Sequence, residues 1–424
     1  MSSVWPRPTL DAPAASRSSP PRIPRVACVV THPIQYQVPL FRYLTASGQI
    51  ALSVFFLSDI SMRGYHDSGF QREIKWDVPL LGGYHHHFVP GWGKPERLSL
   101  CRPLVHGLRR RLRAGQFDAV WLHGYAHQGL LAAILAARSL GIRLWLRGDS
   151  IPTNGPSNLR DRLKRLLAPG FFHLFDGFLT VGKLNYNYYR GFGVPRHKLF
   201  STPYAVDNDF FVRRCAQARP SRERLRAELK MAPGRPVILF AAKFQPRKRA
   251  ADLMEAYCRL SSDGKSEPDP YLLMIGQGEE GDRLRARAAA TGWNSIRFIG
   301  FRNQSELPDF YDLCDVFVLP AAAEPWGLAI NEVLNAAKPV IVSDQVGCAP
   351  DLVEDSYNGF VVPMGNIEAL AARVRDLCGN CALRSSMGQR GAQRVAPFNF
   401  QADLEGLLAA WTAPSRRFSA AAEQ

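Results

Sequence analysis

The stretch "VFVLPAAAEPWGLAINEVLNAAKPVIVSD", from Val316 to Asp344, decides the fold of the chain. Two apolar runs within it, "VFVLPA" and "VIVSD", have the composition and length of buried strands. A helix start lies between them at "EPWG". A strand, a helix and a second strand in this order form a βαβ unit, whose two strands run parallel. The stretch therefore predicts a parallel sheet covered by helices.

The same alternation of strand and helix patterns runs through the chain from Arg25 onward. The further strand candidates are "RVACVVT", "IALSVFFLS", "DAVWLHG", "RLWLRGD", "GFLTVG" and "KLFSTPY" in the first half, and "VILFAAKF", "YLLMIGQG", "IRFIGF" and "GFVVP" in the second. A polar, arginine-rich segment at residues 207–236 separates the two sets, and 424 residues are too many for one ordinary core. The sequence predicts an α/β protein with two Rossmann-like, doubly wound domains. Since ligands bind outside the carboxyl ends of parallel strands, the site is expected in a cleft where the domains face each other.

We expect an N-terminal domain over residues 24–207 and a C-terminal domain over residues 208–399, with a helix at residues 400–413 rejoining the N-terminal domain. Residues 1–23 contain Ser, Pro, Ala and Arg without the apolar run of a signal peptide, which predicts a disordered tail. Residues 414–424 are expected to form a flexible tail.

The charge balance indicates an anionic partner. The chain has 53 Lys and Arg against 37 Asp and Glu, a net charge of +16. Nucleic acid, an anionic membrane surface or a phosphorylated small molecule would each suit this charge. The sequence shows no recognisable nucleic-acid-reading element, so a specific nucleic-acid partner is not expected.

Cysteine usage and hydropathy favour a cytoplasmic location. Eight cysteines are scattered through a large chain, which suits reduced thiols, and "CGNC" at residues 378–381 is interpreted as a helix-ending loop. The most apolar long window, residues 130–146, contains two arginines and is shorter than the roughly 18 to 20 residues of a membrane span.

A dinucleotide-binding interpretation of "GQGEEG", residues 276–281, fails on its neighbours. The segment matches G-x-G-x-x-G, but the expected acidic residue about 20 positions later is absent from "RFIGFRN". Glu279 and Glu280 also crowd the helix start, where they would repel a pyrophosphate.

Two lysines follow the first strand of the C-terminal half. Lys243 ends the strand and Lys248 lies in the loop before the next helix. Together they could bind a diphosphate and neutralise its charge as it leaves. A solvated basic loop is the alternative.

Two glutamates flank the helix start in the opening stretch. Pro325 is expected in the first helical turn, with the N–H groups of Gly327 and Leu328 facing the cleft. Glu324 lies just outside the helix and Glu332 about 9 Å further along it. Phosphate on the N–H groups with sugar hydroxyls on both carboxylates describes a nucleotide-sugar site. Two unrelated surface acids are the alternative.

These residues resemble the retaining group 1 glycosyltransferases of the GT-B fold, whose E-x7-E motif corresponds to Glu324–Glu332. The resemblance includes "AAKFQPRKR", "MIGQGEE", "FIGFRNQSELPDFYDLCDVFVLPA" and "GCAPDLVEDSYNGFVVP" in the C-terminal domain, and "THPIQYQVPLF", "HGYAHQ", "LRGDS" and "PYAVDNDFF" in the N-terminal one. It implies a glycosyltransferase that moves a sugar from a nucleotide-sugar donor to a glycan or lipid-linked acceptor in polysaccharide or envelope glycan synthesis, with no metal or other cofactor.

The resemblance also implies residue roles. Glu324 would contact the transferred sugar, His123 the donor sugar near its reacting carbon, and Glu332 the ribose. Lys243 and Lys248 would bind the diphosphate. The other donor-site residues implied are Gly276, Gly300, Phe301, Arg302, Trp326, Gly327 and Leu328.

The acceptor side departs from the common family pattern. "HPIQYQ" follows the first strand where many members have a Gly-Gly turn, so His32, Gln35, Tyr36 and, from "LRGDS", Arg147 are expected to face the acceptor. Lys243 stands where the family commonly has Arg, which keeps the charge but loses a two-pronged hydrogen-bond donor.

Two further features have competing interpretations. "YHHHF" at residues 84–88 invites a metal site, but adjacent strand residues point to opposite faces, which favours a structural role. The basic amphipathic run from Leu159, followed by aromatic residues interpreted as exposed, suits peripheral contact with an anionic membrane; core packing is the alternative. A nucleotide-sugar-binding scaffold without turnover, and a GT-B epimerase or phosphorylase, are the alternative functions.

Overall fold

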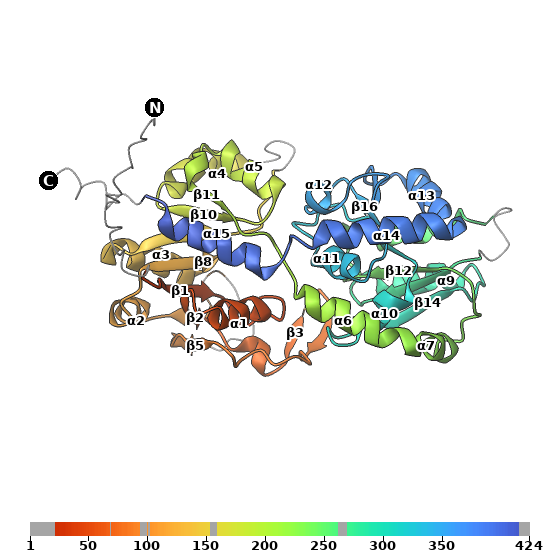
Figure 1. Ribbon diagram of the computed structural model, residues 1–424, viewed down its shortest axis with the longest axis horizontal. Coiled ribbons are helices and arrows are strands. Elements are labelled where there is room, and N and C mark those ends of the chain that lie inside the picture. Colours follow the sequence, from red (N-terminus) through yellow and green to blue (C-terminus); the bar gives the residue numbers. More distant parts are fainter. Residues whose placement is uncertain are drawn as a thin grey trace, which may run out of the picture.

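The computed structural model describes residues 22–67, 69–93, 100, 102–152, 159–261 and 269–414, without the side chains of residues 159–161. The N-terminal tail expected over residues 1–23, apart from its last two residues, and the C-terminal tail after residue 414 lie outside this description. Within it, the expected α/β architecture with two parallel sheets is confirmed (Figure 1).

The N-terminal domain contains a seven-stranded parallel sheet in the order β11-β10-β9-β8-β1-β2-β5. Its strands are β1 (Arg25–Val30), β2 (Ala51–Phe56), β5 (His85–Phe88), β8 (Ala119–His123), β9 (Arg143–Arg147), β10 (Gly177–Thr180) and β11 (Leu199–Ser201). Its helices are α1 (Val38–Ala46), α2 (Leu108–Ala114), α3 (Gln128–Leu140), α4 (Leu159–Phe172) and α5 (Lys183–Gly191), with 3₁₀ turns η1 (Ile60–Met62) and η2 (Arg196–Lys198). The strand order reverses between β1 and β8, so the loops after these two strands open a crevice.

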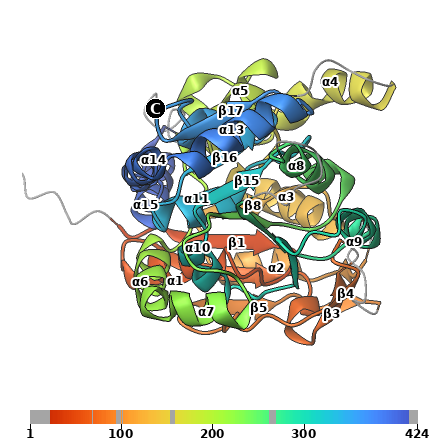
Figure 2. The ribbon, with the colours of Figure 1, turned by 90° about the vertical axis from the view of Figure 1, so that its right-hand side faces the viewer.

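The C-terminal domain contains a six-stranded parallel sheet in the order β14-β13-β12-β15-β16-β17. Its strands are β12 (Val237–Ala241), β13 (Tyr271–Ile275), β14 (Ile296–Gly300), β15 (Val316–Leu319), β16 (Val340–Ser343) and β17 (Gly359–Val362). Its helices are α8 (Ala250–Cys258), α9 (Gly281–Ala289), α10 (Leu307–Leu313), α11 (Leu328–Asn335), α12 (Ala349–Leu352), α13 (Ile367–Gly379) and α14 (Cys381–Val395), with the 3₁₀ turn η4 (Pro246–Lys248). Helices α8 and α9 cover one face and α10 and α11 the other (Figure 2). Here the strand order reverses between β12 and β15.

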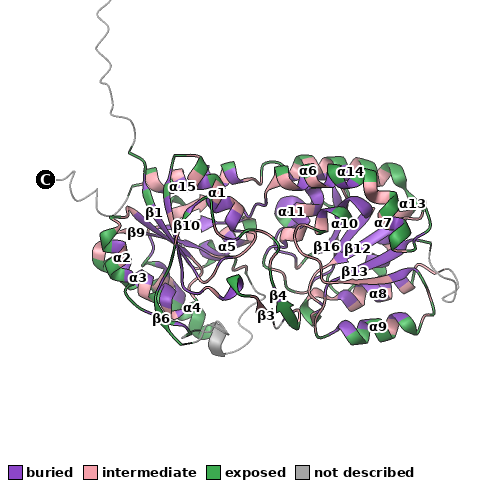
Figure 3. Ribbon diagram, turned by 90° about the horizontal axis from the view of Figure 1, so that it is seen from below, coloured by how far each residue is buried: buried purple, intermediate pink, exposed green. Residues whose placement is uncertain are grey.

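The two domains bury their sheets in the same way. Apolar strand residues such as Leu239 and Val318 are fully buried, and the outward helix faces are exposed (Figure 3). After α14 the chain crosses to the N-terminal domain, where α15 (Phe400–Thr412) packs against β11, β10 and α1. Leu404 and Leu407 of α15 join the core of the first sheet.

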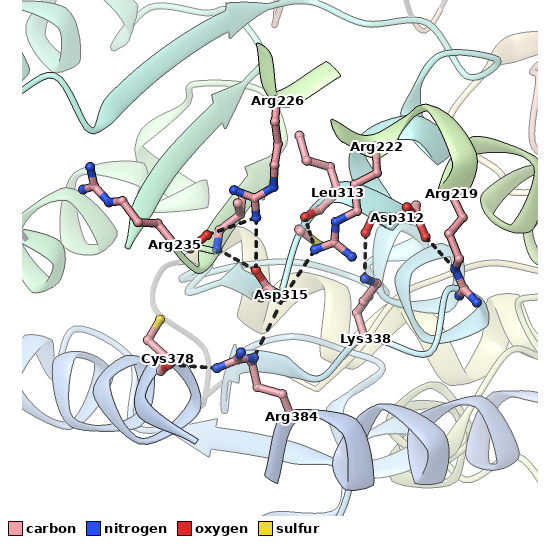
Figure 4. Close-up of polar contacts among 12 residues, drawn as sticks. Arg219, Arg222, Arg226, Arg235, Asp312, Leu313, Asp315, Lys338, Cys378 and Arg384 are labelled. Carbon is pink, nitrogen blue, oxygen red and sulfur yellow. Dashed lines mark hydrogen bonds and ion pairs between the residues drawn. The ribbon is translucent and has the colours of Figure 1, made fainter. Parts of the chain in front are cut away.

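The arginine-rich segment between the sheets is helical and belongs to the packing of the C-terminal domain. It forms α6 (Asn208–Ala218), η3 (Arg219–Ser221) and α7 (Arg222–Glu228), and both α6 and α7 pack on α10. Around Asp315, at the amino end of β15, Arg222 lies 3.4 Å, Arg384 3.9 Å and Arg226 4.0 Å from the carboxylate (Figure 4). Part of the positive charge is therefore used within the fold, far from the carboxyl ends of the strands.

Two small hairpins were not among the sequence-based candidates, whereas the strand assumed for the histidines of residues 84–88 is present as β5. β5 forms the edge of the first sheet, and its His85, His86 and His87 alternate along that strand. The antiparallel hairpins pair β3 (Tyr65–Asp67) with β4 (Arg72–Ile74), and β6 (Gly91–Trp92) with β7 (Leu104–Val105). The β3–β4 hairpin becomes important at the site.

Candidate active site

A cleft of about 380 Å³ lies where the carboxyl ends of the two sheets meet. Loops after β1, β12 and β15 line it, so both topological switch points contribute. Of the residues expected from the sequence, it is lined by His32, Gln35, Tyr36, Lys243, Lys248, Phe301, Arg302, Glu324, Gly327, Leu328 and Glu332. The cleft thus brings together basic, acidic and aromatic side chains from both domains.

Lys248 and Glu324 form a close ion pair at the centre of the C-terminal wall. Lys248 lies in η4 and Glu324 follows β15, and their side chains are only 12% and 13% exposed. Burial, and then the nearby cations Arg247 and Lys243, lower the pKa of Lys248 to about 7. The ion pair with Glu324 opposes this shift, because it favours the ammonium form.

The loop that carries Glu324 is fixed by its backbone. Gly347 N–H donates to Glu324 O over 2.8 Å, and Glu324 forms an isolated bridge with Val346. The expectation for Pro325 is wrong: helix α11 begins at Leu328, and Pro325 precedes it. Gly327 caps the helix at φ +100°, a left-handed conformation that L side chains rarely adopt. The glycine therefore turns the chain so that the helix start faces the cleft.

Glu332 projects from α11 into the cleft beside Tyr311 of α10. The Tyr311 hydroxyl donates a hydrogen bond of 2.6 Å to Glu332 Oε2. Burial raises the pKa of Glu332 to about 7, and the bond from Tyr311 partly opposes that shift. Near neutral pH both the protonated and the ionised form of this carboxyl group are therefore populated.

Two glycines expected in the donor site, Gly276 and Gly300, contribute to its backbone structure without lining the cleft. Gly276 N–H donates to Gly300 O over 3.0 Å. A β-carbon on Gly276 would lie 2.0 Å from Ala242 O, so only glycine fits there. These contacts fix the path of the backbone that leads to Phe301 and Arg302, and both of these residues line the cleft.

The β3–β4 hairpin of the N-terminal domain contributes residues that the sequence analysis missed. Tyr65, Asp67 and Phe70, and Trp76 just beyond the hairpin, line the cleft. Asp67 pairs with Lys243, at 2.8 Å from Oδ1 and 2.9 Å from Oδ2 to Nζ. No local sequence pattern predicts this contact, because its two residues lie 176 positions apart in the chain.

The loop after β1 supplies the remaining expected residues on the N-terminal side. Burial lowers the pKa of His32 to about 4, so its imidazole is neutral at pH 7. The Nδ1 atom of His32 lies 3.0 Å from Thr31 Oγ1. Burial, then Asp149, raise the pKa of Tyr36 to about 12, and Gln35 Oε1 is buried with no hydrogen-bond partner among the described residues. Neutral hydrogen-bonding groups therefore face the cations across the cleft.

Three further expected site residues, His123, Trp326 and Arg147, are not among the residues that line the cleft. His123, at the end of β8, has its Nε2 3.4 Å from the Tyr204 hydroxyl, and the Tyr204 ring contacts Tyr36. Burial and then Arg147 lower the pKa of His123 to about 3. Trp326 is 4% exposed and donates to Asn331 Oδ1 over 2.9 Å.

Arg147 does not reach the cleft lining either. Its guanidinium is 3% exposed and lies 2.9 Å from Asp403 Oδ1 of α15. It also donates to the carbonyls of Thr202 and Pro203, each over 3.2 Å. These contacts attach α15 to the first sheet, which is a structural use of the charge.

The basic helix α4 differs from its expected packing. The aromatic residues that follow its basic part, interpreted as exposed, are buried: Phe172 is 3% and Phe175 0% exposed. Leu163, Leu166 and Leu167 are instead 53%, 76% and 59% exposed. None of the described helices is long and apolar enough to cross a membrane. In the described part of the chain, no three His, Cys, Asp or Glu side chains converge as a metal site would require.

The chain matches a family model in its C-terminal domain and known proteins over about half of its length. Residues 221–394 match the family model described as "Glycosyl transferases group 1". The chain is 31% identical, over 186 residues, to the lipopolysaccharide core biosynthesis glycosyltransferase LpsE of Rhizobium meliloti, covering 43% of this chain and 52% of that protein. It is 26% identical, over 215 residues, to the O-antigen chain mannosyltransferase B of Escherichia coli, covering 50% and 54%. The matches thus span about half the length of these relatives.

Solved structures match over nearly the whole chain. Anabaena HepE in complex with UDP and glucose superposes with a TM-score of 0.67 at 15% identity, covering 92% of this chain and all of that one. Sucrose-phosphate synthase from Thermosynechococcus elongatus gives 0.65 at 18% identity, covering 94% and 100%. The GT-B fold is confirmed, and so is the resemblance to group 1 glycosyltransferases.

Proposed function

From a C-terminal domain that matches the group 1 glycosyltransferases and a shared GT-B fold, we propose that this protein is a retaining glycosyltransferase. It transfers a sugar from a nucleotide-diphosphate sugar to a glycan or lipid-linked acceptor in polysaccharide or envelope glycan synthesis. One observation carries the proposal: Lys243, Lys248, Glu324 and Glu332 line one cleft, at the switch point of the C-terminal sheet.

The donor is held by groups of complementary charge. Lys243 and Lys248 bind the diphosphate, and the N–H groups at Gly327 and Leu328 add a helix start to the same anion site. As the bond to the sugar breaks, the two cations stabilise the negative charge that develops on the leaving phosphate. Glu332 accepts hydrogen bonds from the ribose hydroxyls in its ionised form.

Glu324 accepts hydrogen bonds from hydroxyls of the transferred sugar. Its ion pair with Lys248 holds it beside the diphosphate site, close to the bond that breaks. The leaving phosphate helps to remove the proton of the acceptor hydroxyl, and the anomeric configuration is retained, as in the enzymes that the chain resembles. The neutral His123 contacts the donor sugar, and no metal is required.

The acceptor binds on the N-terminal side, near His32, Gln35 and Tyr36. A second hollow of about 890 Å³ between α1, α6 and α15 shares Gln35 with the cleft. Its lining is rich in amides and aromatic rings, including Tyr43, Asn208, Phe210, Asn399 and Phe400. Amides and aromatic rings are suited to a glycan, since they combine hydrogen bonds with apolar ring contacts. A chain of several sugars would extend from the cleft into this hollow.

A lipid-linked acceptor would require contact with a membrane surface. The exposed Leu163, Leu166 and Leu167 of α4 are interspersed with Arg162 and Arg165. Apolar side chains with flanking cations favour adsorption to an anionic lipid surface. We propose that the protein works in the cytoplasm and contacts the inner face of the membrane peripherally through α4.

Calorimetric titration with UDP, GDP and ADP, followed by their sugar conjugates, tests the donor site. Micromolar binding of one diphosphate is expected, and its base identifies the donor. Incubation of the matching nucleotide sugar with membrane or glycan extracts then separates a transferase from a scaffold, because only the transferase releases nucleoside diphosphate in an acceptor-dependent manner. NMR of the product's anomeric proton reports retention. An epimerase would instead convert the donor without acceptor.

A further inference from the structure

The β3–β4 hairpin reaches from the N-terminal domain onto the diphosphate side of the cleft. It belongs to neither main sheet, and its two strands pair only with each other among the described strands. At its tip, both carboxylate oxygens of Asp67 accept hydrogen bonds from Lys243 Nζ, at 2.8 and 2.9 Å. The cation assigned above to the donor diphosphate is thus already paired with an anion from the opposite domain.

Asp67 is held in place by its own turn. Its Oδ1 accepts from Gly69 N–H over 2.8 Å and from Phe70 N–H over 3.0 Å, and its side chain is 12% exposed. Burial raises the pKa of Asp67, but the hydrogen bonds from Lys243, Phe70 and Gly69 outweigh burial and lower it overall. The group is a carboxylate at neutral pH, and each of its two oxygens accepts at least one hydrogen bond.

The hairpin also packs against the surface expected to hold the base. The Phe70 ring meets the Phe301 ring edge to face, with centroids 4.9 Å apart. The Arg72 guanidinium lies 5.0 Å from the same Phe301 ring, and its Nη1 lies 3.4 Å from Gln277 Oε1. Displacement of Asp67 from Lys243 would therefore also alter the contacts that Phe70 and Arg72 make with Phe301, at the base side of the cleft.

A carboxylate that pairs with a lysine resembles a bound phosphate, because both anions present oxygens that accept charge-assisted hydrogen bonds from the ammonium group. The diphosphate of a nucleotide would bring further negative charge next to Asp67. Like charges at this short distance repel, and an N–H group of Lys243 that donates to one anion is not available to the other. Asp67 and a diphosphate therefore cannot both bind Lys243 with full affinity.

We propose that Asp67 sets the affinity of the cleft for the donor diphosphate by competing with it for Lys243. This inference rests on the proposed function of the cleft. A ligand with a diphosphate displaces the carboxylate and releases the hairpin tip, whereas a nucleoside or a free sugar leaves the pair closed. The competition lowers the affinity of the cleft for a diphosphate and leaves its affinity for a nucleoside unchanged, and displacement of Asp67 couples the hairpin tip to occupancy of the diphosphate site.

The test is the affinity of Asp67→Asn for inorganic pyrophosphate and for UDP, GDP and ADP, measured by calorimetry. Asparagine keeps an acceptor oxygen for the Gly69 and Phe70 amides but removes the charge. The variant is expected to bind each diphosphate about fivefold more tightly than the unaltered protein, the upper range for releasing one partly exposed ion pair. Binding of the corresponding nucleosides should not change, since they lack the competing anion.

A matched control is Asp59→Asn, which removes the same charge from the exposed Asp59–Arg63 pair in the same domain and should leave every affinity unchanged. The double variant Asp67→Asn/Lys243→Met should bind diphosphates no more tightly than Lys243→Met alone, because no cation remains to be released. Thermal unfolding of each variant shows that the comparison concerns folded protein.

The outcomes separate the inference from the proposed function. Diphosphates that bind the unaltered protein and Asp67→Asn equally, or the variant more weakly, would overturn the competition. The proposed donor site itself fails if neither protein binds any diphosphate, and the competition fails with it. A gain that appears equally with nucleosides would assign Asp67 to the base rather than to the diphosphate.

Discussion

The hydroxyl of Tyr311, which is buried, donates a hydrogen bond of 2.6 Å to Oε2 of Glu332 in the cleft lining. The bond connects α10 to α11 and aims the second glutamate of the E-x7-E motif into the cleft. Because burial raises the pKa of Glu332 to about 7 despite this bond, the protonation of the group changes within the physiological range.

The first prediction concerns pH. If the ribose binds the ionised form of Glu332, the advantage of the unaltered protein over Glu332→Gln in nucleoside-diphosphate affinity should grow from pH 6 to pH 8. For a pKa of about 7 the ionised fraction changes about tenfold across this range, which sets the maximum effect. Calorimetry of both proteins measures it. Titration of the ligand's phosphates and of Lys248 cancels in the comparison, since both proteins contain them.

The same shift has a consequence for stability, which provides an independent control. A carboxyl group with a raised pKa in the folded state contributes stability that is complete below its unfolded pKa and is lost as pH rises through about 7. Without ligand, the unaltered protein should therefore lose stability relative to Glu332→Gln between pH 5 and pH 8. A constant difference in unfolding free energy would contradict the assigned shift.

The second prediction separates the two cations of η4. Lys248→Ala should weaken diphosphate binding by about 10- to 100-fold, the range expected for losing a charge-assisted hydrogen bond. Arg247→Ala should have a smaller effect, because the Arg247 side chain is 45% exposed and lies 3.7 Å from Glu324. Titration with UDP, GDP and ADP measures both. Equal losses in the two variants would indicate a general field of positive charge rather than a specific contact.

The third prediction concerns the carboxylate that we propose to be catalytic. Glu324→Ala should nearly abolish sugar transfer, by at least about 100-fold, because it removes the group proposed to contact the transferred sugar. Nucleoside-diphosphate affinity should not fall, since the change releases Lys248 from its ion pair. Turnover and calorimetry on the same preparation test both statements. Loss of binding together with transfer would make Glu324 a structural residue of the loop.

Local sequence patterns predicted the parts of the site that lie on short loops after apolar strands. Lys243, Lys248 and Glu324 all follow buried strands, so the topology brings them to one edge of the C-terminal sheet. Helix α11, by contrast, begins later than Pro325 suggested. The turn geometry is set by Gly327 and by the contact of the loop with Val346, which the sequence pattern did not reveal.

The contributions of the opposite domain could not be predicted in this way. The strands β3 and β4 have three residues each and mostly exposed or half-exposed side chains, so they carry no hydrophobic alternation. Arg147 resembled a cleft residue because it ends a strand, but its partner Asp403 lies 256 positions later in the chain. Contacts of this kind depend on how distant elements pack.

The fourth prediction tests the structural use of Arg147. Asp403→Ala should lower the free energy of unfolding by about 3–5 kcal/mol, because it leaves a buried guanidinium without its counter-charge. The double variant Arg147→Met/Asp403→Leu should recover most of the loss, since it buries no charge. Denaturant unfolding followed by circular dichroism measures both. A double variant as unstable as the single one would mean that Arg147 also stabilises the fold through its bonds to Thr202 and Pro203.

The fifth prediction concerns the exposed leucines of α4. Leu163→Gln/Leu166→Gln should reduce co-sedimentation with phosphatidylglycerol vesicles by about tenfold, because inserted leucines contribute apolar burial at the interface. Arg162→Gln/Arg165→Gln should give a comparable loss that vanishes at high salt, since each cation near an anionic surface contributes about 1 kcal/mol. Phosphatidylcholine vesicles should bind none of the proteins appreciably.

A control for that experiment is Val212→Gln, which changes an apolar residue of similar exposure, 51%, on α6. This variant should bind anionic vesicles as the unaltered protein does. If all three variants lose binding equally, the attraction is spread over the net charge of +16 and α4 has no special part in it. If only the leucine variant loses binding, and does so on neutral vesicles too, the α4 face recognises an apolar partner instead of an anionic lipid surface.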